Sequence, residues 1–314
     1  MLRQLFLPLG LLLAVFSAIL LPAGGIFLAE NYGPRILVIL IFLVSGYQTG
    51  SKALSLDRKL LSIFWLAAAI SLLLAPLLGL LFSKILVLPP YLALGLIVIA
   101  SVPPTISSGV VITEVSGGNT VLALFLTIGL NLLGIFTMPF VLALCLKATG
   151  PIDIDQTALL LKMLLFVLLP FLLGKMVRTL SRRKQVSPLW SYLNSGCVIL
   201  MVYSSIAISR DGFAGLGPST YAQVLAAVAL IHILLLTINH RTGKLLHLPP
   251  GDRKALTFVT SQKTLAIGLA VLTNLQFDTG NALIVCLFFH FFQLFLDSFL
   301  ASAMRNRQAG EPSV

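Results

Sequence analysis

Residues 101–109 read Ser-Val-Pro-Pro-Thr-Ile-Ser-Ser-Gly and interrupt a long apolar run with two prolines and four hydroxyl side chains. A second polar stretch, Thr-Ser-Gln-Lys-Thr at residues 260–264, interrupts an apolar run in the other half of the chain. Proline lacks the backbone N–H that a helix interior needs, and small hydroxyl residues compete for backbone groups. Each stretch therefore predicts a break in an otherwise apolar helix.

The segments that follow these two stretches match each other in order. Each stretch leads into a short apolar segment, a turn of small residues that ends at Asn119 or Asn281, and then a long apolar run. An amide side chain lies twelve residues after each asparagine, Asn131 in the first half and Gln293 in the second. The two halves of the chain are therefore predicted to be structural repeats.

The composition predicts an all-α polytopic membrane protein. Of the 314 residues, 58% are hydrophobic and only 10% are charged, whereas soluble domains carry roughly 25% charged residues. The apolar runs are about 18 to 25 residues long, which is the length of a helix that spans a bilayer. The net charge of +11 comes largely from lysines and arginines in short loops, where phospholipid headgroups explain it better than nucleic acid does.

Ten transmembrane helices are predicted from the apolar runs. The expected boundaries are 5–28, 35–51, 60–82, 92–115, 119–146, 157–178, 191–209, 219–239, 255–274 and 281–303. Five helices fall within residues 1–150 and five within residues 151–314, so each half is expected to be one repeat. Because five is an odd number, the second repeat is inverted in the membrane relative to the first.

The lysines and arginines predict the orientation. With the N-terminus inside, fourteen of those in loops and termini lie on the inner side, and four, Arg35, Lys84, Lys147 and Arg210, lie on the outer side. Positive residues concentrate in cytoplasmic loops, so both termini are expected in the cytoplasm of a bacterium, with the chain in the inner membrane. The leucine-rich run after Arg3 could alternatively be a cleaved signal peptide.

The two predicted breaks indicate a binding site. Backbone that is unwound inside a membrane must face protein or a water-filled cavity, and paired breaks are typical of transporters. The alternative is that Pro103 and Pro104 only kink a structural helix. The residues expected to bind solute or ion are Thr105, Ser107, Ser108, Thr127, Asn131, Ser261, Gln262, Lys263, Thr264, His290 and Gln293.

Lys263 is expected to be functional because of its depth. It lies nine residues after Lys254, roughly 13 Å of helical rise. At that depth its ammonium cannot easily reach the headgroups, and a buried lysine normally faces a cavity or a partner. Protonation of Lys263 could then couple to transport.

His290, Gln293 and Asp297 lie on one face of the last helix. They are expected to form a buried polar network with Lys263, with His290 and Asp297 as further coupling residues. Two alternatives stay open: His290 as an ordinary core histidine, and Asp297 paired with a loop base such as Arg305. His232 has apolar neighbours in its own helix and is expected to be structural.

Three motifs resemble one membrane family. Residues 102–119, 260–268 and 289–293 are similar to the two helix crossovers and the helix 10 pattern of the bile acid:sodium symporter superfamily (solute carrier family ten), particularly its seventh-member branch and the bacterial SBF-like proteins. The resemblance implies ten helices in two inverted repeats. Helices 1, 2, 6 and 7 would form a panel domain and the other six a core domain, in which broken helices 4 and 9 cross.

The resemblance also implies a sodium site near Ser108, Thr127 and Gln262. Sodium-coupled members use a Ser-Asn pair in helix 4, two hydroxyl residues in helix 5 and a glutamate in helix 9. Here Gly109 replaces the asparagine, Ala123 replaces one hydroxyl, and the glutamate position falls near Ser261 and Gln262.

These departures lead to the hypothesis that the Lys263 ammonium takes the place of the cation. Hydroxyls or carbonyls near Thr105, Ser108 and Thr127 would hold it. Two positive charges about 4 Å apart repel by several kcal/mol at an effective dielectric constant near 20, so one site would not hold both.

The sequence therefore predicts a secondary active transporter of an organic, anionic solute. It would work by alternating access, coupled to Na⁺ or H⁺, without a cofactor. The alternative is a membrane regulator of cation (calcium) homeostasis that transports nothing. An enzyme is not expected, because Asp297 is the one clear intramembrane carboxylate and no metal, nucleotide or hydrolase signature is present.

Overall fold

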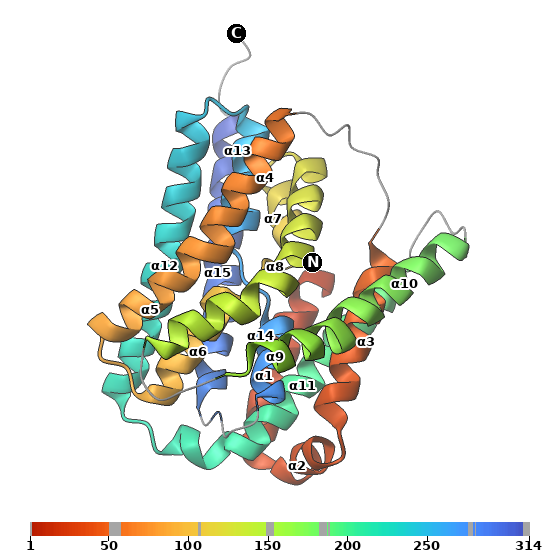
Figure 1. Cartoon of the computed structure of the whole chain (residues 1–314), viewed down its shortest axis with the longest axis vertical. Coiled ribbons are helices and arrows are strands. Elements are labelled where there is room, and N and C mark those ends of the chain that lie inside the picture. Colours follow the sequence, from red (N-terminus) through yellow and green to blue (C-terminus); the bar gives the residue numbers. More distant parts are fainter. Residues whose placement is uncertain are drawn as a thin grey trace. The chain divides into compact units, whose positions relative to one another are not determined.

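The computed structural model describes residues 2–49, 58–105, 108–148, 154–181, 189–275 and 281–309, together with Ser187 and Thr279. Within these residues all regular structure is helical (Figure 1). By their internal contacts the residues group into two compact units.

Unit 1 comprises Met1–Ser51, Ile154–Pro218 and Ala266–Ile284. Its helices are α1 (Leu2–Leu20), α2 (Pro22–Glu30), α3 (Gly33–Gln48), α9 (Gln156–Met163), the π-helix η2 (Leu164–Leu168), α10 (Leu169–Leu180), α11 (Leu189–Ala214) and all but the first residue of α14 (Leu265–Asn274).

Unit 2 comprises Lys52–Asp153, Ser219–Leu265 and Val285–Val314. It contains α4 (Arg58–Ala68), the π-helix η1 (Ala69–Leu74), α5 (Ala75–Ile85), α6 (Pro90–Ser101), α7 (Ser108–Val115), α8 (Thr120–Lys147), α13 (Pro250–Ser261) and nearly all of α12 (Pro218–Leu245) and α15 (Ala282–Ala309).

In unit 1 the first predicted helix, 5–28, is not a single straight helix. Its segments Leu9–Leu20 and Pro22–Glu30 meet at 97°. Pro22 cannot donate a backbone hydrogen bond inside a helix but suits the first turn of the next one. The Tyr203 hydroxyl donates a 2.6 Å hydrogen bond to the Leu21 carbonyl, so α11 satisfies a carbonyl group at the bend.

Among the described residues, seven helices are long and apolar enough to span a membrane, or eight if the bent pair counts as one span. Two further apolar helices, α3 and α6, are shorter. The chain is therefore a multi-pass membrane protein. Ten spans would require α3 and the broken pair α6–α7 to cross as well, and that number remains a prediction.

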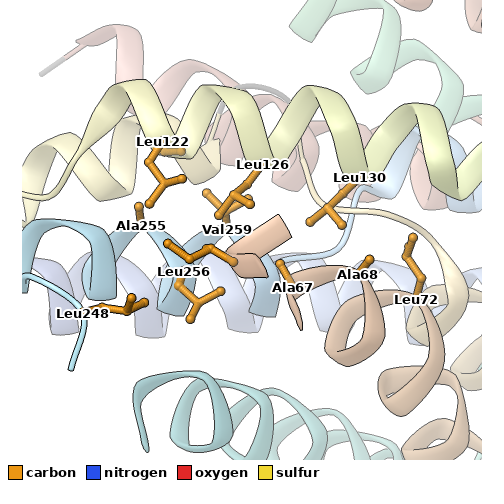
Figure 2. Close-up of a cluster of buried hydrophobic side chains, with 12 residues drawn as sticks. Ala67, Ala68, Leu72, Leu122, Leu126, Leu130, Leu248, Ala255, Leu256 and Val259 are labelled. Atoms are coloured by element: carbon orange, nitrogen blue, oxygen red, sulfur yellow. The ribbon is translucent and has the colours of Figure 1, made fainter. Parts of the chain in front are cut away.

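The core of unit 2 lies where α8 packs against α13 and the junction of α4 with η1. Figure 2 shows Leu122, Leu126 and Leu130, one face of α8, beside Ala255 and Val259 of α13, all buried. Burial of such side chains is worth about 1.5–3 kcal/mol each against water. Within lipid, close packing rather than the hydrophobic effect provides most of the stabilisation.

Candidate functional site

The first helix break lies between α6 and α7, as the sequence predicts. Val102 has an extended backbone, with φ −71° and ψ 151°, because a residue before proline is driven away from helical geometry. Pro103 and Pro104 have no N–H to continue the helix. The break is therefore determined by local sequence.

The second break separates α13 from α14 without a proline. Gln262 is extended, with φ −73° and ψ 154°. The side-chain amide of Gln293, on α15, pairs with the backbone of Lys263: Lys263 N–H donates to Gln293 Oε1, and Gln293 Nε2 donates to the Lys263 carbonyl, both at 2.8 Å. A distant side chain thus takes the backbone groups that the helix loses.

The first connector joins α6 to α7 and is described over residues 102–105, and the second connector, residues 262–264, joins α13 to α14. The two connectors are in contact. Thr264 N–H donates to the Pro103 carbonyl at 3.0 Å. Asn131 Nδ2 donates to the Pro104 carbonyl and to the Thr127 carbonyl, at 2.8 Å each. One backbone hydrogen bond therefore joins the two connectors, and Asn131 of α8 is bound to the first of them.

A chain of polar side chains extends from the first connector to α12. The hydroxyls of Thr105 and Ser108 contact each other and each donate to Gln262 Oε1 at 2.8 Å. Gln262 Nε2 donates to Asp297 Oδ2 at 2.8 Å, and Asp297 Oδ1 lies 2.8 Å from His232 Nε2. Because an ionised carboxylate only accepts hydrogen bonds, it fixes the amide orientation of Gln262. The oxygen of that amide then faces the hydroxyls.

Lys263 points to a different set of partners from those we expected. Its Nζ donates to the Ser71 carbonyl at 2.6 Å, to Ser71 Oγ at 3.1 Å and to the Val102 carbonyl at 3.1 Å. Thr105 and Ser108 bind Gln262 instead, and the Thr127 hydroxyl donates to the Ala123 carbonyl of its own helix. The hypothesis about its ligands is therefore wrong, because adjacent residues of an extended connector project in opposite directions.

The other predicted site residues lie around this centre. Ser261 Oγ donates to the Thr257 carbonyl at 2.7 Å. His290 Nδ1 lies 3.2 Å from Gln293 Nε2, and Gln293 binds the Lys263 backbone, whereas Asp297, the fourth member of the expected network, contacts Gln262 and His232. Ser107 lies outside the described residues.

Asp297 and His232 pair with each other, which neither of the interpretations given for them above includes. Asp297 is fully buried and pairs with His232, whereas the alternative was a loop base such as Arg305. His232 has apolar neighbours along α12 yet faces this carboxylate. The signal that could have revealed the pair is that a buried carboxylate needs a donor, and His232 is the titratable residue in the middle of that apolar helix.

Ser71 was missed altogether. It is fully buried in η1. A single serine in an apolar run gives no sequence signal. Pro76, five residues later, is a weak signal, because it has no N–H to donate to the Ser71 carbonyl in a π-helix.

Comparisons with known proteins agree on one group of relatives. The sequence model of the SBF-like CPA transporter family matches residues 5–306. A protein described as the probable sodium/metabolite cotransporter BASS4, chloroplastic, of Arabidopsis thaliana is 29% identical over 324 residues, covering 96% of this chain and 73% of the relative. Sodium/bile acid cotransporter 7 of Xenopus tropicalis is 26% identical over 172 residues, covering 52% of this chain and 48% of the relative.

Proposed function

Because the chain belongs to the SBF-like CPA transporter family, and so is a transporter and not an enzyme, we propose that it is a secondary active transporter of an organic, anionic solute. The observation that carries the proposal is the contact of two unwound connectors, from Thr264 N–H to the Pro103 carbonyl. Irregular backbone at membrane depth is tolerated where it is buried in protein or lines a site, and such breaks mark transporter sites.

The charges near the connectors support an anionic solute. α7 begins at Ser108, and a helix N-terminus carries a partial positive charge that favours anions. The ammonium form of Lys263 adds positive charge, and its hydrogen bonds go to neutral oxygens rather than to a carboxylate.

The coupling ion in this proposal is Na⁺, held by the oxygens of Thr105, Ser108 and Gln262. These three side-chain oxygens already converge, with Gln262 Oε1 2.8 Å from each hydroxyl. The Asp297 carboxylate lies behind Gln262 and contributes negative charge. The relatives, which are described as sodium cotransporters, support the same ion.

Coupling to H⁺ is the second candidate, and the buried pair of Asp297 and His232 favours it. Their side chains are fully buried and 2.8 Å apart. A carboxylate and an imidazole at that distance can share a proton. This pair connects through Gln262 to the same hydroxyls.

The proposed mechanism is alternating access, in which a core domain moves against a panel domain. The division of the chain into two compact units supports it. Ten crossings, two inverted repeats, both termini in the cytoplasm and residence in a bacterial inner membrane complete the proposal. The similarity of the two break-turn-asparagine segments and the bias of lysines and arginines support these further points.

The test is uptake of labelled solute by proteoliposomes that contain the purified protein. The probes are cholate and a panel of small carboxylates, applied under an inward Na⁺ gradient, under a proton gradient, or with choline in place of Na⁺. We expect rates of anion uptake that depend on the Na⁺ gradient. Gln262→Leu should abolish them, because it removes the oxygen shared by the hydroxyls. Thr137→Val, which removes a hydroxyl bonded within α8, is the matched control.

Uptake that follows the proton gradient and not Na⁺ would replace Na⁺ by H⁺ in the proposal. Intact, folded protein that moves none of the anions under any gradient would contradict the transporter proposal for these solutes. It would favour instead a regulator of cation homeostasis that transports nothing.

A further inference from the structure

The Lys263 ammonium is held by oxygens alone. A charged lysine has three N–H donors, and three oxygens lie within 3.1 Å of Nζ: the Ser71 carbonyl, Ser71 Oγ and the Val102 carbonyl. Two of these oxygens are carbonyls, which only accept, and the Ser71 hydroxyl can accept as well. The three donors of the ammonium form therefore match the three oxygens around Nζ, and the residue is buried to 0% exposure.

The Ser71 carbonyl is free because of a register change in its helix. In an α-helix it would accept from Ala75 N–H, but Ala75 N–H donates to the Ile70 carbonyl, as the π-helix η1 requires. In the π-helical register the donor to Ser71 would be Pro76, which has no N–H. Neither register supplies a backbone donor, so this carbonyl is left for another partner.

Among the described residues no backbone N–H outside the helices donates to the Val102 carbonyl, and the reason is different. Val102 is the last residue before Pro103 and follows the C-terminus of α6. The final carbonyls of a helix have no intrahelical donor and carry a partial negative charge. A change of register before Pro76 in one helix and the end of another helix before Pro103 thus direct two backbone oxygens towards Lys263 Nζ in unit 2.

Oxygens directed at a buried monovalent charge, with no carboxylate among them, are the ligand type of a small monovalent cation. The Asp297 carboxylate binds Gln262 and His232 instead. We propose that the Ser71 carbonyl, Ser71 Oγ and the Val102 carbonyl form a monovalent-cation site, and that the Lys263 ammonium occupies it as a tethered ion.

Only the consequence for transport rests on the proposed function. If the chain transports, Lys263 fills a site that a mobile cation would otherwise fill, so one cation fewer moves with each solute than if the site were open. The existence of the site itself can be tested without any transport measurement.

The test is chemical rescue of Lys263→Ala, a change that removes a fragment equivalent to n-propylammonium. The full-length protein is purified in detergent, and its melting temperature is measured with n-propylammonium chloride, with choline chloride at equal ionic strength, and with n-propanol. We expect a lowered melting temperature that n-propylammonium raises towards the wild-type value. Neither choline nor n-propanol should restore it, and wild type should not respond.

Lys263→Met provides the second variant, since it fills the space of the aliphatic stem without a charge. It should melt below wild type and should not respond to n-propylammonium, because the methionine side chain blocks the site. A Lys263→Met protein that is as stable as wild type would overturn the proposal. The proposal would also fail if n-propanol raised the melting temperature of Lys263→Ala as much as n-propylammonium does, or if neither compound raised it. If Lys263→Ala does not fold, the Lys263→Met comparison decides. Failure of transport in the flux assay would leave these results unaffected.

Discussion

The two helix breaks meet at one hydrogen bond but arise in different ways. The break after α6 contains Pro103 and Pro104, so its backbone cannot be helical whatever surrounds it. The break after α13 contains no proline, and Gln293 of α15 satisfies both backbone groups of Lys263. The first break is local and the second depends on distant residues. Substitutions should therefore act very differently on the two.

The largest effect is expected for Gln293→Leu. It leaves the Lys263 N–H and carbonyl without their partner at a fully buried position. An unsatisfied buried polar group costs about 1–3 kcal/mol, so two such groups should lower stability by several kcal/mol. Thermal melting of the purified protein measures this.

Phe295→Leu is the control for Gln293→Leu, because it lies on the same helix with 78% of its side chain exposed and should melt close to wild type. A Gln293→Leu protein as stable as this control would show that the second break holds without its distant partner. The contrast between the breaks would then be wrong.

Asp297→Asn tests the next layer of support around the second break. The Asp297 carboxylate accepts from Gln262 on one side and faces His232 on the other. An asparagine has one acceptor oxygen in place of two and no negative charge, so one of the two hydrogen bonds to the carboxylate is lost. Loss of a hydrogen bond to a charged group costs about 1.5–3 kcal/mol, so we expect a clear drop in melting temperature, smaller than for Gln293→Leu.

Glu114→Gln removes a carboxylate that is exposed at the end of α7, and it should leave the melting temperature unchanged. Equal effects of Glu114→Gln and Asp297→Asn would mean that net charge matters and the position of Asp297 does not.

The same contrast explains what the sequence could predict. Apolar runs and prolines are local signals, so the helical membrane class and the first break follow from them. The polar residues that gather at the breaks, including Gln293 and Lys263, were also found, because polar side chains are rare in this sequence. Their rarity makes each one informative.

The partners of those residues could not be predicted. Whether Lys263 binds Thr105 or Ser71 depends on the direction in which an extended connector projects each side chain. That direction is set by contacts with Gln293 and Pro103 and not by spacing along the chain. His232 was undervalued for a related reason: its partner, Asp297, lies 65 positions away.

Gly134→Ala tests how closely α8 must approach the first break. A Cβ at Gly134 would lie 2.9 Å from the Pro103 Cβ, which is closer than two carbon atoms pack. Overpacking of this kind costs about 1–3 kcal/mol, partly offset because alanine favours helix by about 1 kcal/mol relative to glycine. We expect a modest net loss of melting temperature.

Gly196→Ala in α11 is the matched control, since a Cβ there meets nothing within 4 Å. It should gain the helix preference without a clash and melt at or above wild type. If Gly134→Ala behaves like Gly196→Ala, then Pro103 can shift without penalty and the first break is looser than its contacts indicate.

The smallest effect is expected for Pro103→Ala. The new residue regains an N–H, but Pro104 still follows it and drives it towards extended geometry. The position 103 carbonyl therefore stays available to Thr264 N–H, and the position 104 carbonyl to Asn131 Nδ2. The free energy of unfolding should change by no more than about 1 kcal/mol, so the melting temperature should stay close to that of wild type.

The double variant Pro103→Ala with Pro104→Ala allows helix to continue past Val102. It should therefore lose both contacts and melt well below the single variant. A single variant as damaging as the double one would show that the first break depends on each proline separately, and so is less robust than the comparison with the second break requires.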